Sequence, residues 1–199
     1  MEVQTILNIL EKKAKEGVDV RLIYDGFGCL TTLPYKYYEE MRKRGIKCQV
    51  FNPFRPILNI IQNNRDHRKI CVIDGWTGFT GGINLADEYI NQRKRFGHWK
   101  DTAIMLEGDA VRSFTLMFLE MWNVAKSEKV EEFDPYLDVI YEREKHSGEG
   151  FVIPYGDSPI DGEHVGKMVY MDILNGVQQR QHIIVVQLLL EEKRHIMEE

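Results

Sequence analysis

The residues best suited to chemistry lie in one short segment, His67-Arg68-Lys69-Ile70-Cys71-Val72-Ile73-Asp74. If this segment is a strand, residues two apart share a face, so His67 and Lys69 point the same way and Arg68 the other. An imidazole can act as a nucleophile or carry a proton near neutral pH, and an ammonium beside it can hold the non-bridging oxygens of a phosphate. The pair therefore predicts a phosphoryl-transfer site.

A glycine-rich segment follows and ends in Gly81-Gly82-Ile83-Asn84. Gly81 and Gly82 let a backbone approach a ligand closely, and the Asn84 amide can donate to a phosphate oxygen. In this composition H-x-K-x4-D is expected roughly 0.025 times by chance, and GGxN at one fixed offset has a probability of about 0.0003. A second H-x-K, at His98, lacks the aspartate. We therefore expect one site, at residues 67–84.

Two carboxylates have different expected roles. Asp74 has the opposite strand parity to His67, so its carboxylate faces away from the imidazole and we expect a structural role. A nucleophilic imidazole needs a carboxylate to fix its tautomer, and our candidate is Asp101; the alternative is an ordinary aspartate at a strand edge. The remaining histidines form no HxH or HxxxH cluster, so we expect no metal and no cofactor.

The elements that must position these residues alternate along the chain. Helical periodicity and turn signals predict helices over 3–16, 35–44, 110–125 and about 163–177. Strands are predicted over 18–25, 46–51, 67–74, 99–106, 151–154 and 182–189, with a charged connector over 128–149. This alternation predicts an α/β domain with helices covering a largely parallel or mixed sheet.

Composition limits the remaining possibilities. With 43% hydrophobic and 29% charged residues, the 199-residue chain is expected to form a single domain over 1–199. Its longest apolar stretch, 183–190, is far below the roughly 20 residues of a spanning helix. The start of the chain has no signal-peptide pattern, so a cytosolic location is expected. Its three cysteines lack CxxC spacing, and we expect buried free thiols.

The charge is unevenly distributed between the two halves. Residues 1–100 carry 17 Lys and Arg against 11 Asp and Glu, whereas residues 101–199 carry 9 against 20. An anionic ligand is therefore expected to meet the first half. The overall net charge of −5 argues against a general nucleic-acid binder.

The motif resembles HxKxxxxDxxxxxxGGxN, the signature of the phospholipase D superfamily. NRDHRK at 64–69, FTGGINLADEYI at 79–90 and WKDT at 99–102 are similar to the first catalytic half of bacterial cardiolipin synthases. VDVR at 18–21 and PYGDSP at 154–159 extend the resemblance over residues 3 to about 190. It implies a phospholipase D-like fold, with a mixed β-sheet flanked by helices on both faces.

The resemblance implies a metal-free, two-step exchange. One histidine attacks a phosphodiester to form a phosphohistidine, a second protonates the leaving alcohol, and an acceptor alcohol takes the phosphatidyl group. The implied partners are an anionic, phosphatidylglycerol-like phospholipid and a membrane surface, and nucleic acid is not expected. The full-length family is placed at the cytoplasmic side of the cell membrane, whereas this chain itself is expected to be soluble.

Two departures leave alternatives open. Such synthases carry membrane-spanning segments and a second HKD motif, and neither is found in these 199 residues, so the chain resembles a truncated half-site. One alternative is a single-motif phosphodiesterase or nuclease that a homodimer completes, and another is an inactive phosphate-binding half-domain. The segment 53–64 is either a membrane-facing lip or an ordinary helix packed on the core.

Overall fold

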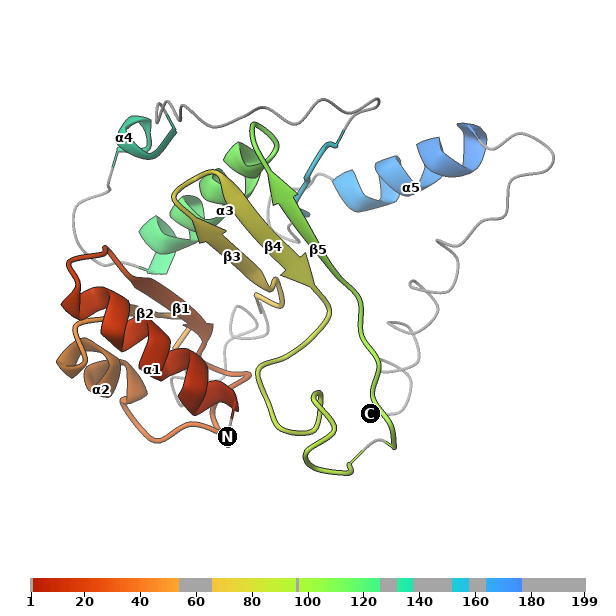
Figure 1. Ribbon diagram of the computed structural model, residues 1–199. Helices are drawn as coiled ribbons and strands as arrows, with labels where there is room; N and C mark the ends of the chain where they lie inside the picture. The colour runs from red at the N-terminus through yellow and green to blue at the C-terminus, as the bar shows by residue number, and fades with distance from the viewer. Residues whose placement is uncertain are drawn as a thin grey trace. The chain divides into compact units, whose positions relative to one another are not determined.

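The computed structural model describes residues 2–53, 66–95, 97–125, 132–137, 152–157 and 164–176 (Figure 1). The chain divides into two compact units, Met1–Pro154 and Tyr155–Glu199. Of the elements described, α5 (Val165–Gly176) belongs to the second unit and all the others belong to the first. The predicted phosphate-binding residues therefore all lie in the first unit.

The first unit begins with two helices packed on a parallel pair of strands. These elements are α1 (Glu2–Lys15), β1 (Arg21–Asp25), α2 (Tyr37–Lys43) and β2 (Lys47–Phe51), and β1 pairs with β2 in parallel. Apolar side chains from both helices and from the strand region share one buried core, made of Leu7, Val20, Met41, Ile46 and Cys48. This packing holds the carboxyl end of β1, where Asp25 lies.

An antiparallel sheet follows in the order β3 (Ile70–Ile73), β4 (Thr77–Gly81) and β5 (Ala103–Glu107). The helix α3 (Val111–Ala125) contacts β2, β3 and β4, so it joins this sheet to the parallel pair. Its buried side chains recur at helical spacing, which gives α3 one apolar face: Val111, Phe114, Thr115, Leu119 and Trp122. A short helix, α4 (Asp134–Leu137), also contacts α3.

A buried glycine sets the close approach of α3 to the sheet. A methyl group at Gly78 would lie 2.9 Å from Cδ2 of Phe114 and 3.2 Å from Cγ1 of Val111. Only a residue without a side chain therefore fits at this position of β4. The helix α3 therefore covers the face of the sheet against which Gly78 packs.

The α/β class is confirmed, with the described strands divided between a parallel pair and an antiparallel sheet. The four predicted helices occur close to their expected bounds, but three strands begin three or four residues later than expected, at Arg21, Ile70 and Ala103. The strand β4 was not predicted, and the strand predicted over 151–154 is wrong for residues 152–154. The predicted strand over 182–189 lies outside the described residues, as do all but the first residue of 53–64 and most of 128–149.

The cysteines are free, as expected, but they are not all buried. Cys48 is buried in the core, Cys29 is partly buried and Cys71 is exposed. The alternation of β3 explains the difference, because Cys71 and Ile73 both lie on the face opposite Ile70 and Val72.

Candidate active site

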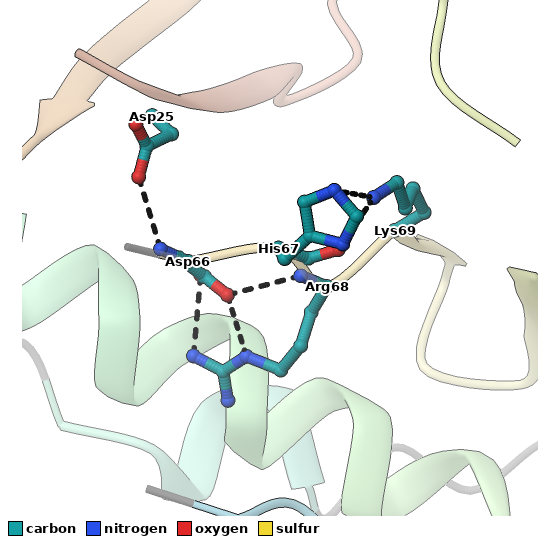
Figure 2. A network of polar contacts seen from close by, with 5 residues as sticks. All are labelled: Asp25, Asp66, His67, Arg68 and Lys69. Atoms are coloured by element: carbon teal, nitrogen blue, oxygen red, sulfur yellow. Dashed lines mark hydrogen bonds and ion pairs between the residues drawn. The ribbon is translucent and has the colours of Figure 1, made fainter. Parts of the chain in front are cut away.

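The side chains of His67 and Lys69 meet just ahead of β3 (Figure 2). Nζ of Lys69 lies 2.9 Å from Nδ1 and 3.0 Å from Nε2 of the His67 ring, and it donates to the His67 carbonyl oxygen at 2.7 Å. The two side chains lie together as the sequence predicts, although they are in irregular backbone and not in the strand itself. An exposed imidazole is thus held in direct contact with a half-buried ammonium.

Three charged or ionisable groups surround the Lys69 ammonium. Burial lowers the pKa of Lys69, and the carboxylates of Asp101 and Asp66 partly oppose this shift. The His67 ring is in direct contact with the same nitrogen. Asp101, 32 positions further along the chain, therefore acts electrostatically on the segment that carries His67.

The backbone before His67 is fixed by a carboxylate that the sequence analysis did not identify. Asp25, the last residue of β1, accepts a hydrogen bond from the Asp66 N–H at 2.9 Å (Figure 2). It also accepts one from the Gly28 N–H. Asp66 in turn pairs with Arg68, whose Nε lies 2.8 Å from Oδ1. The sequence did contain one signal for Asp25: it is a carboxylate at the carboxyl end of a predicted strand. Ligand sites in open α/β sheets gather at that edge.

Gly81 and Gly82 both lie where a side chain would meet other parts of the protein's own chain. A methyl group at Gly81 would lie 2.7 Å from the carbonyl oxygen of Thr102, and one at Gly82 would lie 2.7 Å from Oδ1 of Asp101. The space beside both glycines is therefore occupied by the protein's own chain. They are needed so that the segment leading into β5 can lie against the end of β4.

The two carboxylates occupy different ends of the sheet. Asp101 precedes β5, which begins at Ala103, so it is not within a strand as predicted. It lies beside Gly82 and influences Lys69. Asp74 is in the turn between β3 and β4, with φ +54, at the opposite end of β3 from His67.

Asn84, the last residue of the predicted motif, follows β4 and is half-buried. Its carbonyl oxygen accepts a hydrogen bond from the Ala86 N–H at 2.9 Å, which bends the chain away from the strand. The structure thus brings together His67, Lys69, Gly82 and Asp101, with Asn84 two residues beyond Gly82.

No group of three or more His, Cys, Asp or Glu side chains in the ranges that the structure describes is arranged to hold a metal ion. Among the same residues, no helix has both the length and the apolar character required to cross a bilayer.

The chain is similar in sequence to several bacterial proteins, among which are cardiolipin synthases. A protein of Streptococcus mutans described as uncharacterised is 52% identical over 194 residues, covering 97% of this chain and 41% of the relative. Cardiolipin synthase 2 of Staphylococcus epidermidis is 44% identical over 119 residues, covering 59% of this chain and 24% of the relative. The cardiolipin synthase of Alkalihalophilus pseudofirmus is 45% identical over 126 residues, covering 63% and 25%. The chain therefore spans less than half the length of each of these relatives.

The family comparison covers the whole candidate site. No solved structure matches the chain. A family model described as the PLD-like domain of cardiolipin synthase matches residues 1–122, which include His67, Lys69, Asn84 and Asp101. The chain therefore belongs to the family of cardiolipin synthase PLD-like domains.

Proposed function

We propose that the chain is a phosphatidyltransferase domain of the cardiolipin synthase type, which moves a phosphatidyl group between phosphatidylglycerol molecules through a phosphohistidine. The observation that carries the proposal is the contact between Nζ of Lys69 and the His67 ring at 2.9 Å, within a domain of this family. A nucleophile next to a fixed cation is the arrangement that attack on an anionic phosphodiester requires.

In the first step a nitrogen of His67 attacks phosphorus and the bond from phosphorus to the glycerol headgroup breaks. The departing glycerol oxygen takes a proton from a general acid, and a phosphatidyl-histidine remains. In the second step a hydroxyl of another phosphatidylglycerol gives its proton to the group that acted as the general acid, now a general base, and attacks phosphorus. The bond from phosphorus to His67 then breaks, which releases cardiolipin and regenerates the imidazole.

The other residues of the motif have supporting roles in this proposal. Lys69 and the amide of Asn84 hold the non-bridging oxygens as negative charge builds on them. Asp101 orients the site from beside Gly82, and Asp74 acts structurally from the turn after β3. The proposed general acid is the imidazole of a second copy of an HxKxxxxD motif, because these 199 residues hold one complete copy.

The proposed partners are an anionic phospholipid and the membrane surface that presents it. Incubation with phosphatidylglycerol vesicles should give cardiolipin and free glycerol, measured by mass spectrometry, with no dependence on added metal. His67→Ala should abolish this transfer and leave the circular dichroism spectrum unchanged, because His67 is exposed. His98→Ala, which changes the histidine of the other H-x-K sequence, should transfer at the normal rate.

The other possible results of these experiments would point to different functions. Unchanged turnover in His67→Ala would contradict the proposed nucleophile. Cleavage of labelled DNA in place of lipid transfer would identify a nuclease that a homodimer completes. Phosphate binding without turnover of either substrate would identify an inactive phosphate-binding half-domain.

A further inference from the structure

Both oxygens of the Asp101 carboxylate accept hydrogen bonds that fix the plane of the group. The indole Nε1–H of Trp99 donates to Oδ2 at 3.1 Å, and the backbone N–H of Thr102 donates to Oδ1 at 2.7 Å. Hydrogen bonds to a charged acceptor are stronger than those between neutral groups. The Asp101 side chain is therefore held in one orientation, although the residue itself is only half-buried.

Trp99 is fixed in turn by the loop that precedes it. The side chain of Asn91 accepts from the Trp99 N–H at 2.6 Å and donates to the Trp99 carbonyl oxygen at 2.8 Å. The Tyr89 ring meets the Trp99 ring edge-on, with centroids 4.8 Å apart. Asn91 has φ +62, a conformation that asparagine adopts more readily than most residues. Trp99 is thus held through both its backbone and its ring.

The orientation imposed on Asp101 directs it toward the candidate active site. Oδ1 lies against Gly82, where a methyl group would come within 2.7 Å of it. The negative charge reaches Lys69, whose ammonium contacts the His67 ring. A change in the orientation of the Asp101 side chain would therefore change the electrostatic effect of its charge on Lys69.

We propose that Trp99 and Asn91 are positioning residues, which hold the Asp101 carboxylate in place against Gly82 at the end of β4. The Asn91 side chain holds the Trp99 backbone through two hydrogen bonds, and the Trp99 indole N–H donates to the Asp101 carboxylate. As a role in catalysis this rests on the proposed function. As a statement about Asp101 and Lys69 it can be tested without any lipid.

The test follows the titration of the Lys69 side chain by NMR in protein with labelled lysine, with the signal assigned from its loss in Lys69→Met. Lys69 is faced by Asp66, Asp101 and the His67 ring, and Asp101 raises its pKa. Trp99→Phe keeps the aromatic ring and removes the N–H donor. The Lys69 pKa should therefore fall in Trp99→Phe, by no more than it falls in Asp101→Asn.

Two further variants make the result specific. Trp99→Phe added to Asp101→Asn should cause no further change, because the indole acts only through the carboxylate. Trp76→Phe, in the turn between β3 and β4, is the matched control and should leave the Lys69 pKa unchanged. Asn91→Gly tolerates the positive φ and removes the amide, so it should shift the Lys69 pKa in the same direction as Trp99→Phe.

The outcomes separate this inference from the proposed function. A Lys69 pKa equal to the wild-type value in both folded Trp99→Phe and Asn91→Gly overturns the inference, whatever the lipid activity. A lowered pKa supports it even where no lipid is turned over, a result that would count against the proposed function alone. With activity present, kcat should fall roughly tenfold in Trp99→Phe with little change in KM.

Discussion

The Lys69 ammonium is one group through which pH should act on the candidate site, because it contacts the His67 ring. Its half-buried position makes the charged form costly, and the adjacent carboxylates only partly compensate. The pKa is therefore lowered from the ordinary lysine value of 10.5. A lysine with a lowered pKa loses its proton at a lower pH, so it also loses its affinity for phosphate at a lower pH.

Phosphate binding should consequently weaken as the pH rises through the lowered pKa of Lys69, before 10.5 is reached. The measurement is the dissociation constant of inorganic phosphate by calorimetry from neutral pH upward. Lys69→Arg is the matched variant, because a guanidinium stays charged throughout this range. Its affinity should be independent of pH across the wild-type midpoint. Parallel pH profiles for the two proteins would contradict a role for the Lys69 charge.

The sequence predicts the chemistry of individual residues better than their contacts. The spacing of His67 and Lys69 correctly predicts that their side chains lie together, because a separation of two residues is local information. The hydrogen bond from the Asp66 N–H to Asp25 joins residues 41 apart, so no local pattern reveals it. The same holds for Gly82, where the neighbour that excludes a side chain is Asp101 and is brought there by the fold.

At the scale of elements, the link from β1 to the segment before β3 determines where His67 lies. Asp25 makes this link with one carboxylate, which accepts from the N–H groups of Asp66 and Gly28. The turn after β1 also approaches β2 closely, since a methyl group at Gly26 would lie 2.8 Å from Cγ1 of Val50. Two distant parts of the chain are thereby held by the end of one strand.

Removing this carboxylate should loosen the segment and lower the stability. Asp25→Ala leaves two N–H donors without their acceptor, and the free energy of unfolding should fall by about 1–3 kcal/mol. Phosphatidyl transfer should fall as well, since His67 directly follows Asp66. Asp172→Ala, at an exposed position of α5, is the control and should change stability by less than about 0.5 kcal/mol. Urea denaturation of both variants tests this, and equal stabilities would show that the link is dispensable.

The helices were easier to predict than the strands because their periodicity is repeated over several turns. Each helix of at least seven residues has an apolar stripe or a clear stop, such as Gly17 after α1. The strand β4 has the sequence TGFTG, and because its glycines are poor strand formers the sequence predicts no strand there. Gly78 is there because α3 packs against it, which is a tertiary requirement.

At the scale of the whole molecule, one face of the antiparallel sheet carries exposed apolar side chains among the residues that the structure describes. Cys71, Phe79 and Met105 are cross-strand partners in one row. Phe79 and Met105 are 37% and 57% exposed, and Ile73 on the same face is 50% exposed. On the opposite face, α3 packs against Gly78 of β4. An apolar row that begins two residues after Lys69 is a surface on which a second copy of the chain can pack.

Self-association through this face would bring a second copy of His67 to the site. A two-fold axis near the phosphate would bring two copies of His67 to opposite sides of it, one as nucleophile and one as general acid. We therefore expect light scattering to show a dimer that forms with rising protein concentration. The rate of cardiolipin formation per chain should rise over the same concentration range.

A charged substitution in the row separates this face from any other route to a dimer. Met105→Asp would place a carboxylate among apolar side chains at the interface, so it should shift dimer formation to higher concentration and reduce transfer in parallel. Val124→Asp, at a 68% exposed position of α3, should change neither. If Met105→Asp dimerised and transferred normally, the face would be the wrong one. A strict monomer that makes cardiolipin efficiently would refute the shared site altogether, because its general acid would then have to come from within the same chain.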